Sequence, residues 1–132
     1  MGCVPPAPEF FKALRFLTVR RGALLIFDRT AAGNAKPRRV IEGSLTGLAG
    51  GGGSIRISPK GFIVGACAPR GSVCAWGIEE SGNVAPHWRI PVEQIAGVGL
   101  NGQIALDPAH KEVVVPNGAR NVVMTFSFPE IF

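Results

Sequence analysis

The sequence predicts an all-β chain built from a tandem repeat, and three observations predict this fold class. First, the 132 residues include 18 glycines and 11 prolines, dispersed among turn-forming neighbours as is typical of many short strands. Second, TAAGNAKPRRVI at 30–41 recurs as EESGNVAPHWRI at 79–90, 49 positions later. Third, segments such as SIRIS at 54–58 alternate polar and apolar residues, the pattern of a half-buried strand.

The repeat extends well beyond these twelve residues. At the offset of 49, eight identical or similar residues align without a gap: Gly22/Gly71, Gly33/Gly82, Asn34/Asn83, Pro37/Pro86, Ile41/Ile90, Ile55/Ile104, Ile57/Leu106 and Pro59/Pro108. Val73–Trp76 resembles Val123–Phe126 after one inserted residue, and Leu14–Val19 aligns with Ile63–Ala68. The chain, 132 residues divided by 49, therefore holds about 2.7 repeats. We divide its single domain (1–132) into a partial unit 1–43, a full unit 44–91 and a partial unit 92–132.

The elements follow from this division. Residues 8–17 place Phe10, Ala13, Leu14 and Leu17 at helical spacing, whereas the repeat alignment favours a strand there. LAGGGG at 48–53 should be an exposed connection. The middle unit predicts four strands at 54–58, 62–67, 72–78 and 87–91, with turns at 59–61, 68–71 and 81–83. Gly33 and Gly82 should hold positive φ in equivalent hairpin turns.

Composition limits the class of protein. Hydrophobic residues make up 46% and charged residues 17%, so the chain can bury a core. The net charge of +5 suits an anionic partner. The chain has an odd number of cysteines (Cys3, Cys67, Cys74) without CxxC spacing, which argues against a disulfide framework or a zinc site. We therefore expect the cysteines to be small buried hydrophobic residues of a protein in a reducing cytoplasm. Cys67 and Cys74 could nevertheless lie on neighbouring strands. No secretory signal or membrane-spanning run is expected.

Four strands in about 49 residues match the blade of a β-propeller. The segments LLIFDRTAAGNAKPRRVI (24–41), IALDPAHKEVVVPN (104–117) and NVVMTFS (121–127) resemble the repeats of bacterial NHL/YVTN-type β-propellers. The similarity covers most of residues 14–128, although Ile63–Ala66 lacks the asparagine that Asn117 supplies in the later unit. It implies propeller-like blades of four antiparallel strands. Because propellers have four to eight blades, we expect oligomerisation to complete the ring, with a homodimer favoured and a trimer as the alternative. The other interpretations are a β-sandwich, a barrel or a fragment of a longer protein.

The same resemblance implies a ligand site on the face that carries the turns between second and third strands. Arg21, Arg70 and Arg120 occupy these turns and would form an arginine-rich channel mouth, able to bind carboxylate or phosphate in a bidentate manner. Ser54, Arg56, Asn101, Gln103 and Asn117 are the polar neighbours that could join the site. The alternative is that the arginines are solvated turn residues repeated by duplication.

Catalytic and metal-binding patterns are scarce, so we assign no catalytic residue, metal or cofactor. His87 and His110 are not equivalent in the repeat and lack partners at ligand spacing, while Asp107 and Glu79–Glu80 fit turns. Nucleic-acid binding is disfavoured, because aromatic residues are only 8% and tyrosine is absent. The sequence thus predicts a non-catalytic module that binds an anionic small molecule, glycan or protein segment; the alternative is a lactonase- or oxidoreductase-like propeller enzyme.

Overall fold

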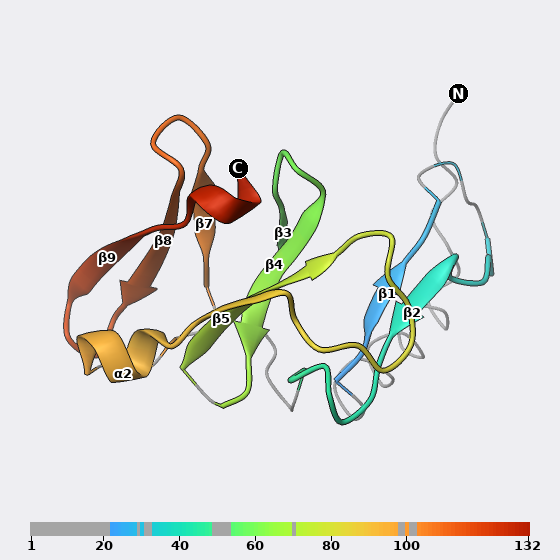
Figure 1. Ribbon diagram of the computed structural model, residues 1–132, viewed down its shortest axis with the longest axis horizontal. Helices are drawn as coiled ribbons and strands as arrows, with labels where there is room; N and C mark the ends of the chain where they lie inside the picture. Colours follow the sequence, from blue (N-terminus) through green and yellow to red (C-terminus); the bar gives the residue numbers. More distant parts are fainter. Residues whose placement is uncertain are drawn as a thin grey trace.

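In the part of the chain that the structure describes, three antiparallel β-sheets follow one another in a row along the long axis (Figure 1). A computed structural model describes residues 22–28, 30, 33–48, 54–69, 71–97, 100 and 103–132. The predicted all-β class is confirmed for these residues. The predictions for Cys3, for residues 8–17 and 14–19 and for the glycine run 49–53 lie outside the described residues. Within the described residues the sheets form an open row and not a closed ring.

The middle sheet, sheet B, has four strands in the order β3 (Arg56–Ile57), β4 (Phe62–Cys67), β5 (Ser72–Gly77) and β6 (Trp88–Ile90). These strands lie within the four segments predicted for the middle unit. Alternating side chains and glycine- or proline-containing turns are local signals, and they set these boundaries. The predicted positive φ of Gly33 (66°) and Gly82 (83°) is also confirmed.

The flanking sheets are smaller in the described part of the chain. Sheet A pairs β1 (Leu24–Ile26) with β2 (Arg39–Ile41), and sheet C has the order β7 (Ala105–Asp107), β8 (Glu112–Asn117) and β9 (Val122–Ser127). A short helix, α2 (Val92–Ala96), connects sheet B to sheet C, and a 3-10 turn (Pro129–Ile131) follows β9. Helix α2 was not expected from the sequence, and it ends at Gly97 in the left-handed conformation.

The strand pairs of the three sheets have corresponding registers. Leu24 pairs with Ile41 in sheet A and Val73 pairs with Ile90 in sheet B, so both partners differ by 49 positions. Phe62 pairs with Gly77 in sheet B, and Glu112 pairs with Ser127 in sheet C. Each residue of the second pair lies 50 positions after its counterpart in the first. All three pairs of β1–β2 and all six pairs of β8–β9 correspond to pairs in sheet B in this way.

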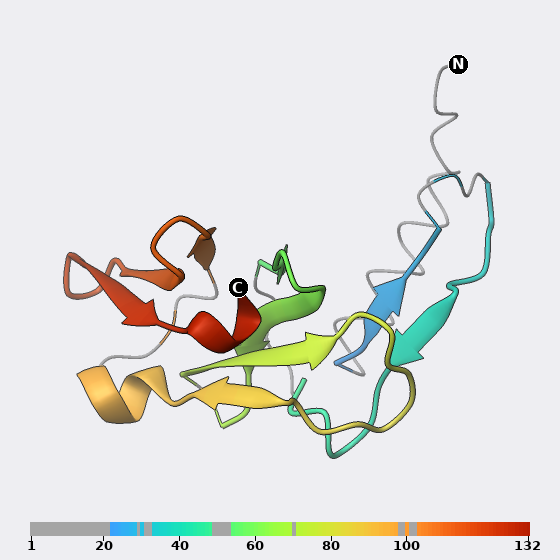
Figure 2. The ribbon, with the colours of Figure 1, turned by 45° about the horizontal axis from the view of Figure 1, so that its top comes forward.

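Sheet B lies between sheets A and C (Figure 2), and its central strands β4 and β5 are buried on both faces, each against one neighbouring sheet. On one face Ile63, Cys74 and Trp76 pack with Leu24 and Ile41 of sheet A. On the other face Val64, Val73 and Ala75 pack in the cluster that contains Val113 and Val115 of sheet C. Successive side chains of β4 and β5 thus serve two separate cores, which explains why these strands read as nearly continuous apolar runs.

Sheets A and B are also joined by hydrogen bonds. The long β5–β6 connection reaches β2, where the Gly82 N–H donates to the Val40 oxygen at 2.7 Å and the Gly82 oxygen accepts from the Glu42 N–H at 3.1 Å. The buried indole of Trp76 donates through Nε1 to the Thr46 oxygen at 3.0 Å. The packing of these two sheets therefore includes directional contacts between residues far apart in sequence.

The expectation of unpaired cysteines at positions 67 and 74 was wrong. Cys67 and Cys74 do lie on neighbouring strands, as the sequence allowed, but they form a disulfide across β4 and β5. Their Cα atoms are 5.8 Å apart, and both side chains are buried on the face toward sheet A. An odd number of cysteines does not exclude a disulfide, because one cysteine can stay outside a pair. The expectation of a reducing cytoplasm rested on unpaired cysteines, and the disulfide removes that support. The cytoplasmic location therefore stays a prediction.

Candidate functional site

Five of the eight predicted site residues are described: Ser54, Arg56, Gln103, Asn117 and Arg120. Arg21, Arg70 and Asn101 lie outside the described residues. Antiparallel pairing places the start of β7 and the end of β8 at one end of sheet C, and likewise the start of β3 and the end of β4 in sheet B. The candidate residues before β7 and after β8 therefore share an end of the structure, which we call the turn end.

Ser54, which precedes β3, forms hydrogen bonds with Ile104, which precedes β7. Its Oγ accepts from the Ile104 N–H at 2.9 Å and lies 3.5 Å from the Ile104 oxygen. Gln103 precedes Ile104 and is exposed, so the structure brings Ser54 and Gln103 into the same neighbourhood. The first strands of sheets B and C thus approach each other at the turn end.

Arg56 does not converge with these residues. Its side chain is exposed on β3, and Nη1 donates to the oxygen of the preceding Ile55 at 3.0 Å. The guanidinium is therefore folded along its own strand.

Asn117 and Arg120 form one turn between β8 and β9. Asn117 is buried, and its Oδ1 accepts from the backbone N–H of Arg120 at 3.0 Å. Because this bond closes the turn, Asn117 has a structural role, while Arg120 is exposed and free to meet a ligand.

A shallow pocket, which the sequence analysis missed, lies at the same end of sheet B. It has a volume of about 270 Å³ and is lined by Pro69, Gly71, Ser72, Pro91, Glu93 and Gln94. The Glu93 N–H donates to the Gly71 oxygen at 3.0 Å, so the start of α2 is fixed to the β4–β5 turn. A Cβ added to Gly71 would lie 2.4 Å from Glu93 Oε2. The sequence does contain a signal for the helix that lines this pocket: Pro91 followed by Glu93 and then Gly97 is typical of a short helix.

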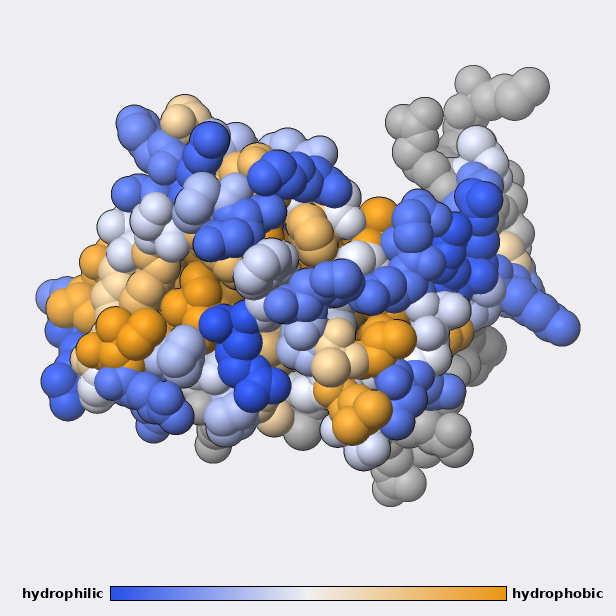
Figure 3. Space-filling view, viewed as in Figure 1, coloured by the Kyte–Doolittle hydropathy of each residue, from blue (hydrophilic) through white to orange (hydrophobic). Residues whose placement is uncertain are grey.

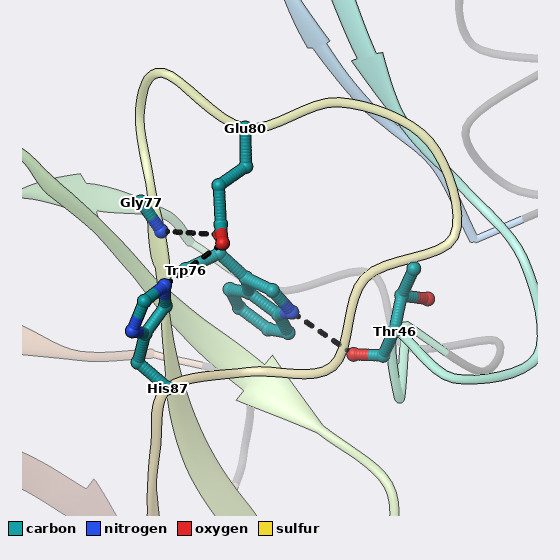
Figure 4. Close-up of polar contacts among 5 residues, drawn as sticks. All are labelled: Thr46, Trp76, Gly77, Glu80 and His87. Carbon is teal, nitrogen blue, oxygen red and sulfur yellow. Dashed lines mark hydrogen bonds and ion pairs between the residues drawn. The ribbon is translucent and has the colours of Figure 1, made fainter.

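Both histidines have carboxylate partners, contrary to the sequence-based expectation. His87 Nε2 lies 2.8 Å from Glu80 Oε1, and Glu80 Oε2 accepts from the Gly77 N–H at 2.8 Å (Figure 4). His87 also packs edge-on against Phe62, with ring centroids 5.7 Å apart. Glu80 thus connects the end of β5 to the start of β6.

The second pair lies in the β7–β8 turn, at the opposite end of sheet C from Arg120. His110 Nδ1 is 2.7 Å from Asp107 Oδ2, and Asp107 Oδ1 accepts from the N–H groups of Ala109 and His110. These bonds confirm Asp107 as a turn residue. The side-chain hydrogen bond to His110 lowers the pKa of Asp107, and the same bond raises the pKa of His110. His110 is exposed and Asp107 is partly exposed, so this pair, which we call the His110 clasp, lies at the surface of the turn.

Other chemical features can be stated only for the described residues. Among them there is no group of three or more His, Cys, Asp or Glu side chains placed to hold a metal ion. In the same part of the chain, none of the helices has the length and apolar character needed to cross a bilayer.

Comparison with known proteins gives short similarities, as two examples show. A stretch of 33 residues is 61% identical to glutamate-1-semialdehyde 2,1-aminomutase of Pelotomaculum thermopropionicum and 54% identical to the enzyme of the same name from Desulfotalea psychrophila. The stretch covers 25% of this chain and 8% of either enzyme. No protein-family model matches the chain, and no solved structure matches it. A similarity this short carries no argument about the fold or activity of the chain.

Proposed function

We propose that this chain is a non-catalytic, propeller-like binding module that recognises an anionic ligand at its turn end. In this proposal the three sheets act as successive blades of the NHL kind, and the ligand is a small molecule, a glycan or an acidic protein segment. The single observation that supports it best is the corresponding register of the sheets, with partners shifted together by 49 or 50 positions.

The register gives the arginines equivalent positions. Cys67 pairs with Ser72 on either side of the β4–β5 turn, and Asn117 pairs with Val122 on either side of the β8–β9 turn. Arg70 and Arg120 are each the third of the four residues between those pairs. Arg21 precedes Leu24 by the same three positions that separate Arg70 from Val73. A repeated arginine at one end of successive blades would concentrate positive charge there.

Charge and hydrogen-bonding capacity favour an anion. The chain has a net charge of +5, and an exposed guanidinium binds carboxylate or phosphate through two parallel hydrogen bonds. Glu93 is an opposing feature, because its carboxylate lies at the pocket beside Gly71. The ligand's anionic group should therefore lie toward Arg120 and away from Glu93.

Titration with citrate and inorganic phosphate, followed by the amide shifts of residues 117–122, tests this proposal. The matched variants are Arg120→Ala and Lys111→Ala, since both remove one exposed positive charge but Lys111 lies in the β7–β8 turn at the opposite end. We expect Arg120→Ala to weaken citrate binding at least fivefold and Lys111→Ala to change it less than twofold. Equal weakening by both variants would mean that net charge alone attracts the anion, and the proposed site would be wrong.

A further inference from the structure

Sheet C presents an outer face at the end of the row of sheets. The part of this face toward the turn end is uncharged, whereas Asp107 and Glu112 lie on the same face at the opposite end. Val114 pairs with Thr125 and Pro116 with Val123, so these four side chains share one face, and Ala105 lies beside Val114. Val123 is 69% exposed, and Figure 3 shows hydrophobic surface over β9 and α2. A sheet face that meets water normally carries polar or charged side chains at alternate positions, so the uncharged part of this face is unusual.

The same positions are buried in sheet B. Fifty positions earlier, Val64, Val73 and Ala75 correspond to Val114, Val123 and Thr125, and all three are fully buried in the core shared with sheet C. The exposed fraction of Val123 is 69%, whereas that of Val73 is 0%. The two sheets have the same register, so the difference lies in what covers them.

The chain itself shows what covers such a face. Sheet A is covered on its Leu24 and Ile41 side by sheet B, and sheet B is covered on its Val64 and Val73 side by sheet C. In both contacts the face that corresponds to Val73 in one sheet packs against the face that corresponds to Ile63 in the next sheet of the row. The sheet that comes next after sheet C would, by continuation of this interface, present the face that sheet A turns away from sheet B. Within strands β1 and β2 that face carries Leu25 and Val40, which pair with each other and are uncharged.

We propose that the outer face of sheet C packs head to tail against sheet A of a second copy of this chain, and that two chains close into a ring of six sheets. The inference rests on the propeller-like arrangement proposed above. Two chains with three sheets each give six, within the four to eight blades of known propellers, whereas three chains would give nine. A two-fold axis along the ring makes the two contacts identical, and closure prevents growth into a filament.

The edge of sheet C is consistent with this contact. In sheet B, β5 is followed by β6, but in the described part of sheet C the corresponding strand β9 has no strand on its outer side. Both the face and the edge of β9 are thus open, and an exposed apolar edge strand promotes association with another chain. A second copy supplies a partner of the same kind as the sheets already in contact.

Solution mass by light scattering on a sizing column tests the contact. For the wild type we expect twice 13.9 kDa. Val123→Lys should yield a folded monomer, because it buries an unpaired charge in the contact. Ile57→Lys is the matched control: Ile57 is 54% exposed on the middle sheet, away from both ends of the row, and this variant should stay dimeric. If Val123→Lys does not fold, Thr125→Lys places the charge on the same face and takes its place.

The outcomes separate this inference from the binding proposal. A wild-type monomer, a mass of three chains or more, or a dimer unaffected by Val123→Lys and Thr125→Lys would overturn the contact. If the wild type is monomeric while Arg120→Ala still loses citrate binding relative to Lys111→Ala, the contact is wrong and the binding site stands. If the dimer behaves as expected but both charge variants bind citrate equally, the contact stands and the binding site is wrong.

Discussion

Replacing Trp76 with phenylalanine should destabilise the protein strongly, because Trp76 joins sheets A and B in two ways. Its side chain is fully buried between the sheets, and its Nε1–H donates to the Thr46 oxygen at 3.0 Å (Figure 4). Trp76→Phe keeps an aromatic ring in place but removes the donor and the five-membered ring. The change therefore perturbs the contact between sheets more than the strand itself.

The expected loss can be worked out from these two contributions. A buried carbonyl that loses its donor costs roughly 1–3 kcal/mol. The missing part of the indole corresponds to roughly two methylene-sized groups, at about 0.8 kcal/mol each. Together they predict a decrease in unfolding free energy of about 3 kcal/mol, which leaves the variant folded, since domains of this kind are stable by roughly 5–15 kcal/mol.

Urea unfolding followed by far-ultraviolet circular dichroism measures this loss without relying on tryptophan emission. The matched control is Trp88→Phe, because Trp88 is 41% exposed on β6 and should lose less than about 1 kcal/mol. The chain has two tryptophans, so each variant retains one. Acrylamide should quench Trp88 in Trp76→Phe and leave Trp76 largely protected in Trp88→Phe. Equal stability losses together with equal quenching would refute the described packing of sheets A and B.

Three further predictions concern the disulfide, the His110 clasp and a glycine turn. Alkylation of the unfolded, unreduced protein should spare Cys67 and Cys74, and reduction should lower the unfolding free energy by about 2.5 kcal/mol for a loop of separation 7; labelling of both cysteines without reductant would contradict the bond. In a proton NMR titration the pKa of His110 should lie above its ordinary 6.5 and fall in Asp107→Asn; an unchanged pKa would contradict the clasp. Because the folded pKa of Asp107 lies below 3.8 and that of His110 above 6.5, the clasp stabilises the turn fully between those pH values, and this contribution is lost as pH falls through the first pKa or rises through the second. Gly71→Ala should lower the melting temperature more than Gly82→Ala: both glycines have positive φ (86° and 83°), but only at Gly71 would a Cβ meet Glu93, with its Cβ at 2.6 Å, and equal decreases would contradict that approach.

The strands of sheet B could be predicted closely because their signals are local. The ends of these strands follow from the alternation in SIRIS, the apolar segment 62–67 and the turns at Gly61 and Gly82. None of these signals depends on which residues pack against the strands. The offset of 49 was also visible in sequence, and the pairing of Leu24 with Ile41 and of Val73 with Ile90 has the same offset.

The remaining features depend on contacts between distant residues. Nothing near Trp76 indicates that its indole meets Thr46, and nothing near His87 indicates that Glu80 bonds both the histidine and Gly77. The disulfide was missed because a count of three cysteines says nothing about which strands are neighbours. At the candidate site, sequence reasoning found the exposed Arg120 but not that Asn117 serves to close its turn, nor that Glu93 lies over Gly71.

Three sheets of corresponding register stack with sheet B in the middle, and an NOE spectrum of methyl-labelled protein tests this arrangement directly. We predict cross-strand NOEs between methyl groups at Leu24–Ile41 and Val73–Ile90, and at Val64–Ala75 and Val114–Thr125. We also predict methyl NOEs that connect Ile63 to sheet A and Val64 to sheet C. A register shifted in one sheet relative to another, or Ile63 and Val64 both contacting the same neighbouring sheet, would contradict this arrangement.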